Sequence, residues 1–513
     1  MFLVGIHFLN FRKNMDSRFR GNDLKKFCIR FMIEHILSSL HYIYPEITLL
    51  GTILTIIIAD VFLSSHKKIS FVIIAFIGIF LLATFLIQQQ FSLNAIFDGM
   101  LTIDSFARFF KLLIIAAGAF TILFSLNSSE LTTIHQRLGE YYAILFTAML
   151  GMFLMVSATH LLTLYLAIEL TSISFYILVG IIKERQSSSE ASLKYILYGA
   201  FSSGVMLYGL SLFYGMFGSL EFSAIQIALI EGSTNPLLLL FATLCLLVGL
   251  GYKISIVPFH FWTPDVYEGA PITITAFLSV ASKISGFALL MRIVMMFSEV
   301  KEIPLQQILI IISILTMTIG NLVALWQNNI KRFLAYSSIA HAGYLLLGCV
   351  TMGKEGLMAM MLYSGIYLFM NLGTFYVAMF VADIKQSEHL DAYKGLGKSF
   401  PFLSIAMVIF LISLTGLPPT AGFIGKLYLF SSLMNAKLVW LALIAVINSI
   451  ISLYYYIRII RNMFLRDEEL PIITHNIFLF PQKILLLLLL LPTIIFGMYF
   501  SPLMELVRSS ILK

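Results

Sequence analysis

Apolar runs about as long as a membrane is thick recur along most of this 513-residue chain. A transmembrane helix needs roughly 20 mainly apolar residues, because each residue advances the helix by about 1.5 Å. The chain is 59% hydrophobic and only 12% charged, whereas an average soluble domain has about 25% charged residues. The sequence therefore predicts an integral membrane protein in a lipid bilayer. It excludes a cytosolic enzyme, a nucleic-acid-binding protein and a secreted scaffold.

Polar breaks divide the apolar runs into about fourteen predicted transmembrane helices, so we expect an all-α integral membrane protein. The runs lack the two-residue alternation over about ten residues that is typical of membrane β-strands. The predicted spans lie near residues 44–63, 69–88, 109–127, 140–158, 160–182, 190–217, 236–258, 271–298, 304–326, 333–351, 355–382, 400–433, 438–464 and 482–503.

The distribution of Lys and Arg between loops predicts the orientation. One set of loops holds fourteen of these residues and the opposite set holds seven, Arg108 and Lys111 among them. Since cytoplasmic loops are richer in Lys and Arg, the first set is predicted to be cytoplasmic. The segment before the first span carries seven more basic residues on the side that should be poor in them. We therefore expect either an additional crossing before the first span or translation from about Met32, and we favour the later start.

Ionisable residues inside the predicted spans are the strongest functional signal. A charge at the bilayer centre costs roughly 2.5–3.5 kcal/mol and usually marks an ion or proton pathway. Arg292 lies near a helix end, where snorkelling to the interface explains it. His341 lies mid-span, where a neutral ring bonded to a backbone carbonyl competes with a proton-carrying role. The cations within spans are Lys194, Lys253, Lys283, Arg292 and Lys426, and Glu169 is the acidic residue nearest a span centre.

Lysine suits proton transfer in lipid, because burial favours its neutral form and a nearby carboxylate favours its charged form. A carboxylate that moved could therefore switch a lysine between taking up and releasing a proton. Glu169 is the natural partner, and the spacing leaves open whether it meets Lys253 or Lys194.

Two predicted spans are interrupted by proline. The seventh contains Pro258 and Pro264, and the twelfth contains Pro418 and Pro419. Proline removes an amide donor, and non-helical backbone at membrane depth is tolerated only where protein or a water-filled cavity covers it. Two interrupted helices in corresponding halves point to a transport site. Spans four to eight and nine to thirteen are thus predicted to form two five-helix repeats, inverted because each has an odd number of helices.

Four motifs resemble the antiporter-like membrane subunits of respiratory complex I, the proton-pumping NADH:quinone oxidoreductase. The resemblance covers about residues 42–505. A lysine at position 426, where subunit M is expected to have glutamate, favours the subunit N type, the counterpart of mitochondrial subunit 2. The end of the chain after the fourteenth span also separates it from subunit L. The motifs are the stretch from Lys253 to Lys283 with PFHFWTPDVYEGAP at 258–271, ELTSISFY at 169–176, LAYSSIAHAGY at 334–344 and GLPPTAGFIGK at 416–426.

The resemblance implies a proton path through Glu169, Lys194, Lys253, Lys283 and Lys426, with His341 as an additional candidate. It implies that this chain has no redox centre and no metal, and the three cysteines lack a metal-site spacing. NADH, FMN, iron–sulfur clusters and quinone would belong to the complex, whose other membrane-arm subunits connect this chain to the peripheral redox arm. The expected location is the cell inner membrane.

The resemblance also suggests a division of the chain. Residues 1–31 form a basic N-terminal extension, 42–140 hold the first three helices, 140–464 form the proton-conducting core and 482–505 form the last helix. Two other functions remain open at this stage. One is a subunit of a multisubunit sodium/proton antiporter, and the other is a structural membrane subunit that pumps nothing.

Overall fold

The computed structural model describes residues 39–62, 68–91, 95–232, 235–298, 303–466 and 480–511. The predicted extension 1–31 and the proposed start at Met32 lie outside these residues. Within the described ranges the regular structure is helical, accompanied by four isolated β-bridges.

The helices fall into an N-terminal group, two units of five spans each, and a C-terminal pair. The N-terminal group is α3 (Tyr44–Phe62), α4 (Lys68–Gln88) and α5 (Ser105–Asn127). The first unit, after η1 (Glu130–Arg137), is α6 (Leu138–Ser157), α7 (Leu161–Val179), α8 (Gln186–Phe217), α9 (Phe222–Ile230), α10 (Pro236–Ile254), α11 (Trp262–Gly269), α12 (Ile272–Phe277), η2 (Leu278–Ser282) and α13 (Lys283–Met296). The second unit is α14 (Leu305–Ala324), α15 (Ile330–Val350), α16 (Lys354–Lys385), η3 (Leu390–Tyr393), α17 (Leu396–Ser399), α18 (Pro401–Thr415), α19 (Ala421–Asn435) and α20 (Val439–Leu465), and the C-terminal pair is α21 (Phe480–Met498) and α22 (Ser501–Ser509).

The prediction of fourteen spans is confirmed. In the part of the chain that is described, thirteen helices are long and apolar enough to cross a membrane. The remaining predicted span, the twelfth, is present as the two shorter helices α18 and α19. The last predicted span, 482–503, was too long at its C-terminal end. Its helix ends at Met498, and Pro502 lies in the first turn of a separate short helix that buries Leu503, Met504 and Val507.

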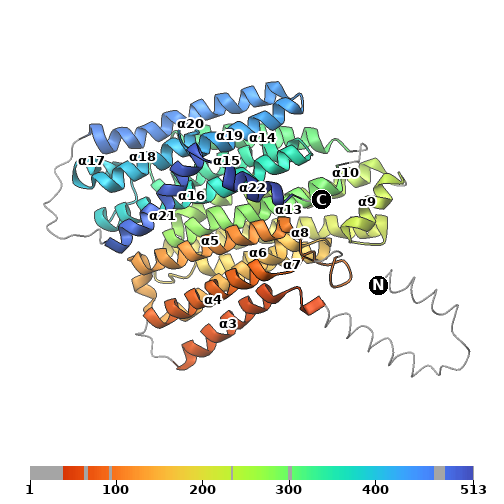
Figure 1. The fold of residues 1–513 in the computed structure, drawn as a ribbon, viewed down its shortest axis with the longest axis horizontal. Helices are drawn as coiled ribbons and strands as arrows, with labels where there is room; N and C mark the ends of the chain where they lie inside the picture. Colours follow the sequence, from red (N-terminus) through yellow and green to blue (C-terminus); the bar gives the residue numbers. More distant parts are fainter. Residues whose placement is uncertain are drawn as a thin grey trace, which may run out of the picture.

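The helices run roughly side by side, with α3 and α4 at one edge of the molecule and α20 at the opposite edge (Figure 1). Helix α3 packs on α4 and α6, α8 packs on α10, and α14 packs on α15. The span from Ile272 to Met296 is wholly buried, and α15 and α16 are almost wholly buried. The interior therefore lies where the two units meet, and side chains placed there are shielded from lipid.

The two spans that were predicted to be interrupted by proline, the seventh and the twelfth, are both broken. Helix α10 ends at Ile254, where Ser255 has a left-handed φ of 61°, and the chain becomes helical again in α11. Helix α18 ends at Thr415, where Gly416 has φ 88°, and the chain becomes helical again in α19. Each break lies within two helical turns of a lysine. Lys253 is the penultimate residue of α10, and Lys426 lies near the start of α19.

Candidate functional site

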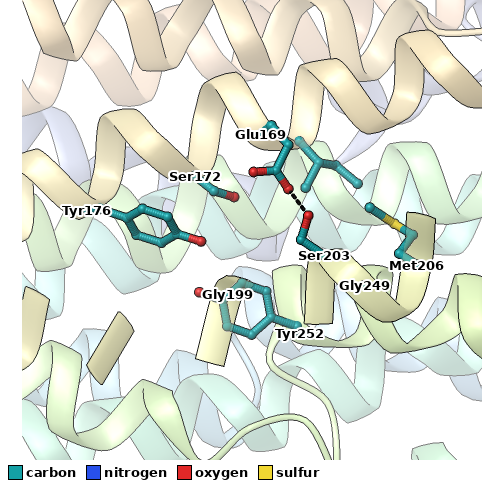
Figure 2. Close-up of a pocket in the computed structure, with 9 residues that line it drawn as sticks. Glu169, Ser172, Tyr176, Gly199, Ser203, Met206, Gly249 and Tyr252 are labelled. Atoms are coloured by element: carbon teal, nitrogen blue, oxygen red, sulfur yellow. Dashed lines mark hydrogen bonds between the residues drawn. The ribbon is translucent and has the colours of Figure 1, made fainter. Parts of the chain in front are cut away.

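Glu169 lies in α7 and faces a small cavity between α7, α8 and α10 (Figure 2). Its carboxylate accepts a hydrogen bond from the hydroxyl of Ser203 on α8. Figure 2 shows the hydroxyls of Tyr176 and Ser172 near the same space. The cavity measures about 10 Å³, which is room for about one water molecule. The carboxylate therefore faces a small cavity that is lined in part by hydroxyl groups, among three otherwise apolar helices.

Lys253, near the end of α10, is 1% exposed and contacts a residue that lines this cavity. Its Nζ donates to Ser172 Oγ at 3.1 Å and lies 5.6 Å from the ring centroid of Phe175. Ser172 also lines the Glu169 cavity. The hydroxyl of Ser172 thus lies between the lysine and the pocket that holds the carboxylate, and it makes Lys253 the lysine associated with Glu169.

Lys194 has different partners. Its Nζ lies 2.8 Å from Asp265 and 2.9 Å from Glu190, and its side chain is 40% exposed. On the same helix, Ser203 contacts Glu169, and Ser203 lies nine positions after Lys194, which corresponds to about 13.5 Å along the helix axis. That distance exceeds the reach of a lysine side chain. The structure therefore brings Lys253, and not Lys194, to the Glu169 pocket.

Lys283 begins α13 directly after a π-helical turn, η2. Its Nζ donates to Ser338 Oγ at 2.6 Å and to the carbonyl of Ser338 at 2.9 Å. The π-helical turn is fixed from α16, where Asn371 donates to Ser279 Oγ at 2.8 Å. Such turns interrupt regular α-helices and are frequent at functional sites.

His341 is 2% exposed and lies between two tyrosines. Its Nδ1 is 2.6 Å from the hydroxyl of Tyr363, and its Nε2 is 3.4 Å from that of Tyr456. The expected backbone carbonyl partner was wrong, because aromatic hydroxyls from α16 and α20 take that place. Hydroxyls can both donate and accept, so this histidine is placed among groups that can exchange protons with it.

Lys426 is held at the second break. Its Nζ donates to Ser449 Oγ at 2.6 Å and to the Thr415 carbonyl at 2.8 Å, which the break leaves without a helical partner. The Nζ atom also lies 4.3 Å from the ring centroid of Tyr344. Like Lys253 and Lys283, this lysine is buried among hydroxyls, carbonyls and aromatic rings.

One face of α15 connects these groups. Ser338, His341 and Tyr344 follow one another at intervals of three residues, so they lie above one another on the helix. Ser338 binds Lys283, and Tyr344 contacts Lys426. The face spans about 9 Å. Sequence reasoning found the histidine and missed its two neighbours, although their spacing in LAYSSIAHAGY carries the signal.

Two buried ion pairs contradict the sequence analysis. Lys111, which was counted with the outer loops, lies in α5 and pairs with Glu46 at 2.5 Å. Arg292 does not snorkel, because its side chain is only 6% exposed. Its guanidinium pairs with Asp104 at 2.9 Å and donates to the Val156 carbonyl at 2.8 Å. Both pairs join segments that are far apart in sequence. The sequence analysis considered one span at a time and therefore could not predict them.

Outside the spans, Glu130 joins η1 to the start of α12. Its carboxylate accepts from the amide of Ile272 at 2.8 Å and from Arg185 at 2.5 Å. Burial by itself would raise the pKa of Glu130. The charge of Lys331, the Ile272 amide and Arg185 outweigh burial and lower the pKa below its ordinary value of 4.5.

In the described ranges, no group of three or more His, Cys, Asp or Glu side chains is arranged so that it could hold a metal ion. Cys245 and Cys349 are buried free thiols there.

Comparisons with known proteins show the family. The family model described as NADH:quinone oxidoreductase/Mrp antiporter, TM matches residues 158–452. The NADH-quinone oxidoreductase subunit N 2 of Chloroherpeton thalassium (strain ATCC 35110 / GB-78) is 43% identical over 479 residues, which cover 91% of this chain and 93% of that protein. The NADH-quinone oxidoreductase subunit N of Chlorobium chlorochromatii (strain CaD3) is 42% identical over 497 residues, covering 94% and 96%.

The fold agrees with these matches. A chain in the solved structure of respiratory complex I from Thermus thermophilus with bound Aureothin aligns with a TM-score of 0.73 and 30% identity, covering 90% of this chain and 98% of that one. The family model matches more than half of the chain, and the relatives match it over most of its length. The chain therefore belongs to the NADH:quinone oxidoreductase/Mrp antiporter family of membrane subunits, in its subunit N branch.

Proposed function

We propose that this chain conducts protons within NADH-quinone oxidoreductase along a line of polar groups that runs from Glu169 through Lys253, Lys283 and His341 to Lys426. The observation that carries the proposal is the face of α15, whose residues contact Lys283 at one end and Lys426 at the other. A membrane helix made only for packing would have no reason to present polar groups toward two buried lysines.

The central lysines suit proton transfer because their partners are neutral. Lys253, Lys283 and Lys426 donate to serine hydroxyls and backbone carbonyls, and none has a carboxylate partner among the residues that the structure describes. A buried ammonium without a counter-ion is costly, so each lysine can release its proton. Hydroxyls of serine and tyrosine between them can accept one hydrogen bond while donating another.

Glu169 is the proposed electrostatic switch for Lys253. When the carboxylate is charged and close, it favours the ammonium form, and when it is protonated or displaced, the lysine releases its proton. The hydroxyl of Ser172 lies between the two groups. Lys194 lies off this line, on the Asp265 side of α8, so its part in proton transfer is the least direct of the candidates.

The relatives carry the name of NADH-quinone oxidoreductase subunit N, and the structural neighbour is a chain of respiratory complex I. This chain therefore acts with other membrane-arm subunits in the inner membrane. Electron transfer from NADH through FMN and iron–sulfur clusters to quinone takes place in partner subunits. The family model itself also describes Mrp antiporters, so the proposal of a complex I subunit rests on the named relatives.

The test uses the purified whole complex in proteoliposomes. Lys253→Met and Lys426→Met should lower the number of protons pumped per NADH oxidised, because methionine fills the space of lysine but cannot carry a proton. Arginine at either position should rescue little, because guanidinium hardly deprotonates. Lys437→Met is the matched control, since Lys437 is exposed between α19 and α20.

Equal assembly must first be shown for all variants by subunit composition. Normal pumping by Lys253→Met and Lys426→Met in fully assembled complex would overturn the proposed path and favour a structural subunit. Absence of flavin and iron–sulfur subunits from the purified assembly would instead favour the antiporter alternative.

A further inference from the structure

Asp265 lies on α11, the short helix after the first break, and binds a cation from each five-helix unit. Its Oδ2 lies 2.8 Å from Nζ of Lys194 on α8, and its Oδ1 lies 2.6 Å from Nη1 of Arg332 on α15. Helix α8 belongs to the first unit and α15 to the second. Each cation has one further carboxylate partner, Glu190 for Lys194 and Glu268 for Arg332, and Arg332 also donates to Oε1 of Gln327 at 3.4 Å.

The helix that carries Asp265 is tied to the Lys253 side of the break by aromatic contacts. Trp262 stacks on Tyr195 with ring centroids 4.4 Å apart, and its indole donates to the Tyr252 carbonyl at 3.1 Å. The hydroxyl of Tyr252 donates to the Tyr195 carbonyl at 2.9 Å. Tyr195 follows Lys194 and Tyr252 precedes Lys253, so a shift of α11 acts on the backbone beside both lysines.

Arg332 lies in the first turn of α15, the helix that presents the polar face of the second unit. It lies six residues before Ser338, the partner of Lys283. Next to Arg332, Lys331 is wholly buried and donates to the carbonyl of Ala270, directly after α11, at 3.1 Å. The start of α15 and the end of α11 are therefore held together by adjacent residues, and a rigid helix transmits a shift along its axis.

We propose that Asp265 is a positioning residue that couples the two units: it divides one negative charge between Lys194 and Arg332, so that a change at Lys194 alters how firmly Arg332 and α15 are held. The proposal rests on the proton-conducting function proposed above. Lys194 and Arg332 are both cations, so they repel each other and their favourable coupling must pass through the carboxylate. When the Lys194 charge leaves or moves, Arg332 gains a larger share of that carboxylate.

Replacement of Asp265 should leave the complex assembled. Without it, Lys194 keeps Glu190 at 2.9 Å and Arg332 keeps Glu268 at 2.9 Å. The side chains of the cluster are between 29% and 60% exposed, so no deeply buried charge is left alone. This makes Asp265→Asn a usable test variant, and Asp265→Glu restores the carboxylate.

The experiment is a triple-mutant cycle on the purified whole complex in proteoliposomes, with protons pumped per NADH oxidised as the readout. Lys194→Met and Arg332→Met are measured singly and together, in the wild-type background and in Asp265→Asn. With Asp265 present, the combined effect should differ from the product of the single effects by about threefold, a size typical of partly exposed ion pairs. In the Asp265→Asn background, the effect of the combined Lys194→Met and Arg332→Met changes on pumping should equal the product of their single effects. In the Asp265→Glu background, the coupling should return.

The matched control is the ion pair Arg137–Glu184, which is also partly exposed, with 3.2 Å between its atoms. Arg137→Met should show no coupling with Lys194→Met. Multiplicative effects in the wild-type background, or coupling that persists in Asp265→Asn, would overturn the proposal. Coupling that is seen only in the thermal unfolding midpoint and not in pumping would mean that Asp265 only stabilises the fold, and this result would also overturn the proposal. Failure of the proposed function is recognised separately, by normal pumping of Lys253→Met.

Discussion

The buried pair between Lys111 and Glu46 allows a quantitative prediction for the N-terminal helices. Nζ of Lys111 on α5 lies 2.5 Å from Oε1 of Glu46 on α3, and the two side chains are 1% and 6% exposed. The Nζ atom also lies 5.5 Å from the ring centroid of Phe153, and Oε2 of Glu46 has no hydrogen-bond partner among the described residues. The pair thus ties α3 to the bundle with no solvent to replace a lost partner.

Lys111→Met should weaken the docking of α3 strongly. Removing one partner of a buried pair leaves an uncompensated charge and costs about 3–5 kcal/mol. Since about 1.4 kcal/mol corresponds to a factor of ten, the fraction of complexes with α3 undocked should rise by about 10²- to 10⁴-fold. Glu46→Gln together with Lys111→Met removes both charges and should return the docking free energy to within about 1 kcal/mol of the wild type.

Hydrogen–deuterium exchange of the α3 amides in the purified complex measures this opening, because exchange reports local as well as global unfolding. The exchange of α15 serves as the internal reference, since that helix is buried between the two units. An increase of less than about tenfold for Lys111→Met would refute the reasoning. A double variant no better than the single one would refute it too, because the cost would then come from packing and not from the unpaired charge.

Two further predictions concern the Glu169 pocket and the loop that contains Glu130. Gly199→Ala should lower the number of protons pumped per NADH oxidised, because the added Cβ would collide with the hydroxyl of Tyr176. Gly204→Ala, on the same helix, should pump normally, because a Cβ at that position has no atom within 4 Å. Glu130→Gln should lower the thermal unfolding midpoint at pH 7 by an amount that corresponds to about 1 kcal/mol, since it loses Arg185. The folded-state pKa of Glu130 is lowered, so the charged carboxylate stabilises the folded protein above pH 4.5 and loses this effect as the pH falls through the folded pKa. The thermal unfolding midpoints of the wild type and Glu130→Gln should therefore converge at that low pH.

The sequence predicted the elements that depend on local chemistry. Apolar runs of about 20 residues specify spans whatever they pack against, since lipid surrounds them in any arrangement. Prolines at 258 and 418–419 specify the breaks, because a missing amide donor acts on its own turn. Lys253, Lys283 and Lys426 were recognised from their depth in a span, which is also a local property.

Only the tertiary structure decided which groups meet. Lys111 and Glu46 are 65 residues apart in sequence and Arg292 and Asp104 are 188 apart, yet each pair is in contact. Helix packing sets these distances, and the apolar pattern of a membrane span says little about which face meets which neighbour, because lipid and protein interiors are similarly apolar. For the same reason the sequence left the partner of Glu169 open. The packing of α7 against α8 and α10 then placed Lys253 beside its pocket and left Lys194 with Asp265.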